Sequence, residues 1–480
     1  MPPDLLVAYV LTSLLVLAVA SLALRSASRL LFRSYGRTWR DVYRALRVRT
    51  NRFKLTEKAR IREDLMKDRE VVDAMVVHAR EAGESLAATE ARAREFLDEI
   101  VPAFDLVSYY KIGMPIARFV LGSLYKLVSW KDELPDMNRL HAEAAVVYIF
   151  NHRSNADFVY AALALTDRVA LSYAVGEWAR VWPLEPLFKS FGSYFVRRGC
   201  KEKLYHQVLR RYVQLITQRG VPQGIFLEGG LSRDGHFRDA KVGLLDHILQ
   251  CAKAPEFGRD ILFVPGCLNY DRVLEDRALT AEARGKKPER SLWRMFKRTS
   301  KILFRGSLKL AFRRTRKHGY AALRLGKPVS FKAHLAAEGR AILYLPREER
   351  QAHVKRFADG LMAEVARLMP VPCVPLVSLA LAEEHEPVER DELVARVAAL
   401  RRELEAAGAR VVRADKGDAE ICDYACLLLE TRGTLLRLRD GRYRVNEADR
   451  ELFRYYAASV QHLVACPLPR PAPVSAGPAV

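Results

Sequence analysis

A histidine and an aspartate five residues apart could form a proton-transfer pair. His152 and Asp157 lie in the segment Asn151-His152-Arg153-Ser154-Asn155-Ala156-Asp157-Phe158. A histidine can take a proton from a hydroxyl, and a neighbouring carboxylate can orient the imidazole and stabilise its positive charge. On one helix the two side chains would point about 140° apart, so they meet only if the residues between them form a turn. Asn155 would cap the helix that follows. The alternative interpretation is a polar loop with a capping aspartate.

The flanking residues predict such a turn. The apolar run 144–150 predicts a buried strand before His152, and residues 158–165 predict a helix after it. From about residue 140 to 335, similar apolar runs alternate with helical segments such as 201–218. Strands are expected at 145–150, 170–174, 193–196, 224–227, 261–264 and 321–325. This alternation predicts an α/β domain with a central mixed sheet flanked by helices.

Three further strand ends carry residues that could bind an anion or an acyl chain. These are Arg197 and Arg198 after 193–196, Glu228, Gly229, Gly230, Ser232 and Arg233 after 224–227, and Val264 and Pro265 at the end of 261–264. Arginine suits bidentate phosphate recognition, and glycines let backbone N–H groups approach an anion closely. The apolar strand would form a wall for an acyl chain. Taken singly, each has a plainer alternative, such as solvated arginines or an ordinary tight turn.

Together and in this order, the four strand ends resemble the motifs of the glycerol-phosphate acyltransferase superfamily. Those motifs are Asn-His-x-x-x-x-Asp, Gly-x-x-Phe-[Ile/Val]-Arg-Arg, Phe-x-Glu-Gly-[Gly/Thr] followed by Ser and Arg, and an apolar block with Val-Pro. They match residues 151–157, 192–198, 226–233 and 264–265. The long helical region before the first motif, and Phe453-Arg454-Tyr455-Tyr456 near the C-terminus, are most similar to the large bacterial and mitochondrial type of glycerol-3-phosphate acyltransferase. The resemblance covers residues 55–465.

The resemblance implies a reaction and a role for each residue. His152 would deprotonate the 1-hydroxyl of glycerol 3-phosphate, with Asp157 supporting its imidazolium. The oxygen would attack the thioester of acyl-CoA or acyl carrier protein without an acyl-enzyme, giving lysophosphatidic acid for phospholipid synthesis. No cofactor or metal is expected, because thioester transfer needs only a base and anion stabilisation. The acceptor would be held by Arg153, Ser154, Arg197, Arg198, Glu228, Gly229, Gly230, Ser232 and Arg233.

The third motif departs from the family pattern at one position. The large glycerol-3-phosphate class usually reads Gly-Gly-Arg-Ser-Arg there, and this chain reads Gly229-Gly230-Leu231-Ser232-Arg233. An apolar side chain therefore stands where a cation is expected. Phosphate binding could be weaker, the acceptor could be another phosphorylated molecule or a lysolipid, or an arginine from elsewhere in the chain could compensate.

The N-terminal sequence and the net charge predict a membrane location. The 480-residue chain carries a formal net charge of +22, which suits nucleic acid, an anionic membrane face or phosphorylated substrates. Residues 5–24 contain no charge and, as a helix, could span a bilayer core of roughly 30 Å. Residues 1–4 lack the basic segment of a signal peptide. Ten basic residues and one acid between 25 and 54 predict a single-pass anchor with the catalytic domain on the cytoplasmic side.

A second basic segment also favours a membrane. Between residues 286 and 317 thirteen Lys or Arg and one acid alternate with apolar and aromatic residues. Such a pattern fits nucleic acid or a membrane interface, and the predicted anchor favours membrane phospholipids, with no nucleic acid partner. Residues 104–130, interrupted by Gly113 and Pro115, would form a core or interfacial helix, with a second membrane span as the alternative. The seven cysteines include no C-x-x-C pair, so a zinc site is not expected.

The predicted organisation has five parts. They are an anchor and basic juxtamembrane helix at 1–54, a helical region at 55–135, an acyltransferase α/β domain at 136–382 with a basic insert at 284–317, a mainly helical lobe at 383–466, and a disordered tail at 467–480. The alternative from a different class is a membrane-tethered anion-binding protein. Such a protein would need neither His152 nor Asp157.

Overall fold

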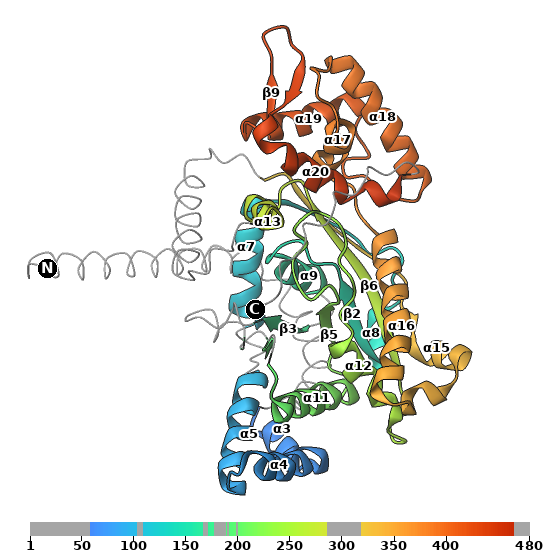
Figure 1. The fold of residues 1–480 in the computed structure, drawn as a ribbon. Coiled ribbons are helices and arrows are strands. Elements are labelled where there is room, and N and C mark those ends of the chain that lie inside the picture. Colours follow the sequence, from blue (N-terminus) through green and yellow to red (C-terminus); the bar gives the residue numbers. More distant parts are fainter. Residues whose placement is uncertain are drawn as a thin grey trace, which may run out of the picture. The chain divides into compact units, whose positions relative to one another are not determined.

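The computed structural model describes residues 58–102, 109–166, 171–176, 189, 192–197, 200–285 and 318–464 (Figure 1). The predicted anchor at 1–54, the insert from residue 286 to 317, Arg198 and the tail at 467–480 lie outside these residues. Within the described ranges, no helix combines the length and the apolar character needed to cross a bilayer.

A mixed sheet forms the centre of the described chain. Its order is β1-β7-β6-β2-β5-β3-β4, with β8 also paired to β6. The strands are β1 Lys126–Trp130, β2 Ala144–Phe150, β3 Ser172–Gly176, β4 Tyr194–Val196, β5 Gln223–Phe226, β6 Asp260–Tyr270, β7 Tyr320–Leu325 and β8 Val329–Ser330. From β6 to β4 along this order all neighbours are parallel, whereas β7 and β8 run antiparallel to β6. The predicted α/β class with a central mixed sheet is confirmed.

The strand β2 lies in the core of this sheet. Every residue of β2 is buried, which explains its unbroken apolar sequence, since a parallel strand covered on both faces shows no alternation. Helix α9 (Asp157–Leu165) follows β2, and α16 (Arg347–Arg367) packs against β2 and β6. Figure 1 shows α9 and α16 on opposite sides of these strands. The six strands expected from the sequence are all present, with ends that shift by a few residues.

The strand β6 is longer than the sequence predicts. A turn is expected at Pro265, but the strand continues to Tyr270, so this prediction is wrong. Proline has no N–H to donate to a neighbouring strand. Pro265 falls where the antiparallel neighbour of β6 changes from β8 to β7, so the missing donor disrupts neither pairing. The Pro265 carbonyl still accepts a hydrogen bond from Gly326 N at 2.8 Å.

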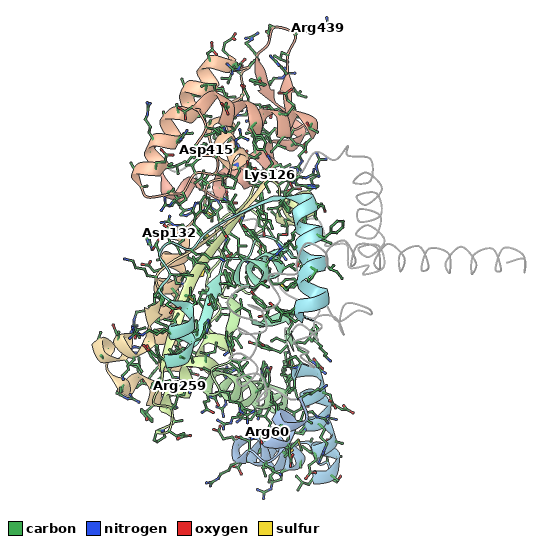
Figure 2. All side chains as sticks on the ribbon, turned by 180° about the vertical axis from the view of Figure 1, so that it is seen from behind. Arg60, Lys126, Asp132, Arg259, Asp415 and Arg439 are labelled. Atoms are coloured by element: carbon green, nitrogen blue, oxygen red, sulfur yellow. The ribbon has the colours of Figure 1, made fainter. Side chains whose placement is uncertain are left out.

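The apolar residues before β2 do not form one helix. Helix α7 covers Met114–Leu124 and the chain then enters β1, while residues 103–108 lie outside the description. The prediction of a helix over 104–130 is therefore wrong for residues 126–130, which form β1. The strand β1 pairs in parallel with β7, and Lys126, labelled in Figure 2, places its Nζ over the rings of Tyr320 and Tyr424. These partners are almost 200 or more residues away, so local sequence does not reveal the strand.

Some helices precede the sheet in the sequence, and others lie between or after its strands. Before it come α3 Lys58–Met66, α4 Arg69–Ala82 and α5 Leu86–Ile100, which pack on α11 (Lys203–Gln218). The predicted break at Gly83 is confirmed: this glycine ends α4 in the left-handed conformation, at φ 66°. The region also contains α8 Met137–Glu143, α12 Gly243–Leu249, α13 Asp276–Ala283 and α15 Phe331–Glu338.

The C-terminal residues form a mainly helical lobe, as predicted. It comprises α18 Arg390–Ala406, α19 Asp418–Thr431, the hairpin of β9 Leu435–Arg437 and β10 Tyr443–Val445, and α20 Arg450–Ala458. Helix α17 (Cys373–Leu381), which precedes residue 383, packs against α18, α19 and α20. Figure 1 shows these elements together in orange and red.

Candidate active site

The first and third motifs meet at one edge of the sheet. Strands β2 and β5 are parallel neighbours, so their carboxyl ends, Phe150 and Phe226, point the same way. In open α/β sheets this edge is where ligands bind. His152 follows β2 by two residues, and the loop after β5 contacts it directly, because Ser232 N donates to the His152 carbonyl at 2.9 Å.

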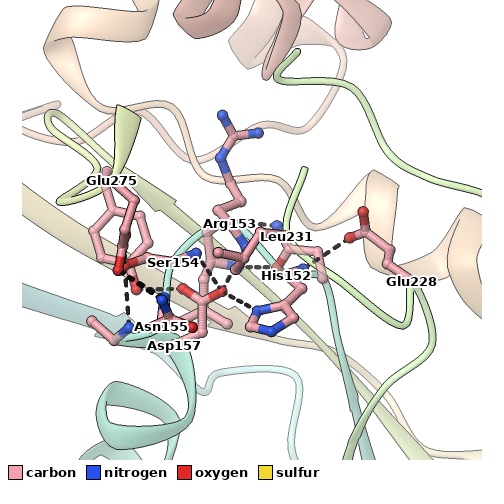
Figure 3. A network of polar contacts seen from close by, with 12 residues as sticks. His152, Arg153, Ser154, Asn155, Asp157, Glu228, Leu231 and Glu275 are labelled. Carbon is pink, nitrogen blue, oxygen red and sulfur yellow. Dashed lines mark hydrogen bonds and ion pairs between the residues drawn. The ribbon is translucent and has the colours of Figure 1, made fainter. Parts of the chain in front are cut away.

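His152 and Asp157 form the predicted pair. Nδ1 of His152 lies 3.0 Å from Oδ2 of Asp157, and the residues between them form the predicted turn (Figure 3). A carboxylate only accepts hydrogen bonds, so the bond assigns the ring proton to Nδ1 and leaves Nε2 as an acceptor. The imidazole stacks on Phe226 with ring centroids 4.3 Å apart. Its side chain keeps 13% of its surface exposed, whereas Asp157 keeps none.

Asp157 is held by hydrogen bonds from every side. Its Oδ2 also accepts from Arg153 N at 2.6 Å and Ser154 N at 2.9 Å, and its Oδ1 accepts from the Tyr270 hydroxyl at 2.6 Å. Burial raises the pKa of Tyr270, which therefore donates as a neutral phenol. These donors stabilise the carboxylate charge and fix the oxygen that orients the His152 ring.

The expected cap by Asn155 is wrong. Helix α9 begins at Asp157 with Ala156 as its N-cap residue and no side-chain cap. The N and Nδ2 of Asn155 instead donate to Oε1 of Glu275, at 3.3 and 3.2 Å, and Ser154 Oγ donates to the other oxygen at 2.8 Å. Glu275 is a half-buried carboxylate that needs donors, and its loss of hydration raises its pKa. Ser154 is fully buried, so its hydroxyl supports the turn.

Glu228 joins the first and third motifs. Its Oε1 accepts from His152 N at 2.8 Å, and its Oε2 accepts from Arg238 N at 3.0 Å. Only 1% of Glu228 is exposed, and this burial raises its pKa to about 7. Glu228, a predicted substrate-binding residue, thus anchors the backbone of His152.

The rest of the third motif forms a tight, internally bonded turn. Gly229 has φ 64°, a conformation that favours glycine, and a Cβ there would lie 2.9 Å from Lys241 Cγ. Gly230 is buried beside it. Ser232 Oγ donates to the His236 carbonyl at 2.6 Å and accepts from Gly235 N at 3.1 Å. The Ser232 hydroxyl is therefore engaged within its own loop.

Each described arginine among the predicted site residues already has a partner. Arg197, after β4, pairs with Glu99 of α5, with Nε 2.9 Å from Oε1. Arg233 pairs with Glu282, with 3.1 Å between Nε and Oε2. Arg153 is 2% exposed and donates from Nη1 to the Gly235 carbonyl at 2.8 Å. Its guanidinium lies 5.0 Å from the centre of the Tyr455 ring, and Figure 3 shows it pointing away from His152.

Val264 and Pro265 lie inside the sheet. They pair with Tyr148 and Ile149 of β2, and both are buried. An acyl-chain wall at these residues stays a prediction. Within the described residues, no cluster of three or more His, Cys, Asp or Glu side chains could hold a metal ion.

Sequence reasoning missed the residues from distant segments that hold the turn at 151–157 in place. Besides Tyr270 and Glu275, Asp276 binds the C-terminal lobe: it accepts from the Tyr456 hydroxyl and lies 2.8 Å from Arg432 Nη1. The only local signal was the Tyr455-Tyr456 pair, which contributed to the resemblance without a role. The adjacent carboxylates of Glu275 and Asp276 therefore connect the turn at residues 151–157 to the C-terminal lobe.

Comparison with known proteins agrees with this arrangement. A family model described as acyltransferase matches residues 132–269, and one described as glycerol-3-phosphate acyltransferase C-terminal region matches 282–467. The glycerol-3-phosphate acyltransferase of Aeromonas hydrophila is 27% identical over 359 residues, covering 72% of this chain and 42% of the relative. That of Shewanella loihica is 28% identical over 334 residues, covering 65% and 39%. The chain thus matches about two fifths of the length of these relatives.

One solved structure also aligns with part of the chain. It is the 1-acyl-sn-glycerophosphate acyltransferase of Thermotoga maritima, with a TM-score of 0.30 and 16% identity. The alignment covers 53% of this chain and 78% of that one. At this TM-score the superposition supports no conclusion.

Proposed function

We propose that this chain, which belongs to the glycerol-3-phosphate acyltransferase family, transfers a fatty acyl group from an acyl thioester to the 1-hydroxyl of glycerol 3-phosphate. The product would be lysophosphatidic acid. The observation that carries the proposal is the His152–Asp157 contact of 3.0 Å, at the carboxyl edge of the sheet and beside the loop of the third motif.

The geometry supports a direct transfer. Nε2 of His152 takes the proton of the acceptor hydroxyl as its oxygen attacks the thioester carbonyl, and Asp157 stabilises the resulting imidazolium. A tetrahedral oxyanion forms, the carbon–sulfur bond breaks, and the thiolate leaves with the proton from Nε2. The enzyme returns to its starting state, so no acyl-enzyme and no cofactor are required. The donor is acyl-CoA or the acyl thioester of acyl carrier protein.

The Phe226 ring supports the role of the base. An aromatic ring stacked on one face of the imidazole limits its rotation, and the Nδ1 hydrogen bond fixes its tilt. A base held in this way loses little rotational freedom when the acceptor binds, which favours general-base catalysis.

A membrane location also belongs to the proposal. Residues 5–24 would anchor the chain, with the catalytic part on the cytoplasmic side and the basic segments at 25–54 and 284–317 against anionic phospholipids. Deletion of residues 1–24 should weaken membrane binding and leave a part that falls with rising salt. Full membrane binding that ignores both the deletion and salt would contradict these roles.

The function is tested with the full-length protein purified in detergent. Radiolabelled glycerol 3-phosphate and a long-chain acyl-CoA should yield labelled lysophosphatidic acid. Absence of product with acyl-CoA and with acyl carrier protein as donors would reject the proposed reaction. The same assay with other phosphorylated alcohols and lysolipids addresses a second candidate, a different acceptor, which Leu231 favours because it stands where the family usually has a cation.

A further inference from the structure

The phosphate of the proposed acceptor needs cations that are open to solvent. A dianionic phosphate is recognised by Arg and Lys side chains whose charge is not already neutralised. The predicted arginines that the structure describes do not meet this condition: Arg197 pairs with Glu99, Arg233 pairs with Glu282, and Arg153 is buried. The described part of the site therefore requires another source of positive charge.

Two exposed cations lie on the loop that follows the third motif. Arg238 and Lys241 are exposed, and no ion pair joins either of them to a carboxylate in the described part of the chain. The nearest acid along the loop, Asp239, lies between them in the sequence and is itself exposed, and the next one, Asp234, accepts a hydrogen bond from His236 N on its Oδ1 at 3.1 Å. The charge of Arg238 and Lys241 is therefore available to a bound anion.

Hydrogen bonds place Arg238 close to the base. Its backbone N donates to Oε2 of Glu228, and Oε1 of the same carboxylate accepts from His152 N. One carboxyl group therefore separates the two backbones. The Arg238 guanidinium turns back over the motif, because its Nη1 donates to the Leu231 carbonyl at 3.3 Å. It thus stands beside the residue at which the expected cation is missing.

Lys241 lies at the other end of the same turn, beside Gly229. Its backbone N donates to the Leu227 carbonyl at 2.7 Å, and its aliphatic stem packs where a Cβ of Gly229 would be. Arg238 and Lys241 thus flank the turn 229–231. Glycine at 229 supplies both the positive φ and the space for the lysine stem.

We propose that Arg238 and Lys241 bind the phosphate of the acceptor, and that Arg238 supplies the charge that Leu231 lacks. The inference rests on the proposed function for the identity of the ligand. It explains how the third motif binds an anion although its own cations are absent or paired. It also predicts that an arginine at position 231 can replace the one at position 238 in binding the phosphate.

The test measures binding apart from turnover. Isothermal titration of the full-length protein with sn-glycerol 3-phosphate, and with inorganic phosphate, is compared among wild type, Arg238→Leu, Lys241→Gln and the double variant Leu231→Arg with Arg238→Leu. Loss of one charge-assisted contact should raise Kd about ten- to hundredfold. The double variant should return Kd to within about threefold of wild type. Arg259→Leu, at an exposed arginine shown in Figure 2, is the matched control and should leave Kd unchanged.

The outcomes separate the inference from the proposed function. Unchanged Kd in both Arg238→Leu and Lys241→Gln, or no wild-type binding of either anion, overturns the inference. A loss in Arg238→Leu that the double variant does not restore overturns the compensation of Leu231. Intact, Arg238-dependent binding without acyl transfer would reject the proposed reaction and leave the anion site in place.

Discussion

The turn at residues 151–157, which we propose to be catalytic, and the loop at residues 234–241 are built in opposite ways. In the turn, Asp157 has no exposed surface and accepts four hydrogen bonds. In the loop, Arg238 and Lys241 are exposed and meet no carboxylate among the described residues. One region fixes its central carboxylate before substrate arrives, and the other leaves its charges unpaired.

This difference matches the two tasks. A general base works only in one orientation, so the hydrogen bonds that hold it are formed in advance by folding. A phosphate is nearly spherical and can be held by flexible cations in several geometries. We therefore expect substitutions in the turn to lower kcat strongly, and substitutions in the loop to change acceptor affinity while leaving kcat nearly intact.

Replacement of the base should have the largest effect. His152→Gln keeps a polar side chain of similar reach but cannot take the hydroxyl proton, so kcat should fall about 10²- to 10⁴-fold. The KM for acyl-CoA should change less than threefold. Steady-state rates of lysophosphatidic acid formation measure both. If His152→Gln were as active as the wild type, His152 would not be the general base.

Replacement of the orienting carboxylate should have the next largest effect. In Asp157→Asn an amide nitrogen can face Nδ1, which would favour the tautomer with its proton on Nε2 and lose the base. We expect kcat to fall about 10²-fold, the lower end of the usual contribution of a general base. Tyr270→Phe removes a single donor to the other oxygen and is the milder comparison. If kcat fell as much in Tyr270→Phe as in Asp157→Asn, the loss would reflect disturbed packing around the turn and not the missing carboxylate charge.

The Glu228 carboxyl makes stability depend on pH. Its pKa is raised from 4.5 to about 7 in the folded protein, so between these values the folded state binds more protons than the unfolded state. Stability therefore falls as pH rises through this interval, by roughly 3 kcal/mol if the unfolded value is the ordinary one. The free energy of unfolding, measured in urea at pH 4.5, 5.5, 6.5 and 7.5, should decline with rising pH in the wild type. It should decline less in Glu228→Gln. Parallel pH profiles in the two proteins would contradict the assignment.

Sequence reasoning reached the catalytic pair because its determinants are local. The apolar run 144–150 and the helical pattern after it predict both sides of the turn, and the polar residues between them must lie at the sheet edge. The same local logic placed the break at Gly83. Periodicity and turn chemistry carry this information within a window of a few residues.

The supporting contacts were not predictable because they join distant segments. Glu275 is about 120 residues from the serine and asparagine that it holds, and nothing near 155 distinguishes a capping asparagine from one bound elsewhere. Pro265 predicts a strand end locally, but the exchange of β8 for β7 allows the strand to continue. The pairing of Arg197 with Glu99 likewise required the three-dimensional placement of α5. Motif spacing indicated a candidate anion-binding region, and only the structure shows which of its described cations lack a carboxylate partner.

Among the substitutions that affect the turn, the smallest effect is expected at Glu275, which accepts hydrogen bonds from Ser154 and Asn155. In Glu275→Gln one oxygen is retained and the serine hydroxyl can rotate to accept from the new amide, so part of the network survives. We expect kcat to fall about threefold to tenfold, with the KM for glycerol 3-phosphate unchanged, and the free energy of unfolding to fall by about 1–2 kcal/mol. Glu256→Gln, at an exposed glutamate, is the matched control and should change neither. A rise in KM with unchanged kcat would place Glu275 on the side of acceptor binding, and the division between a rigid turn and an adaptable loop would then fail.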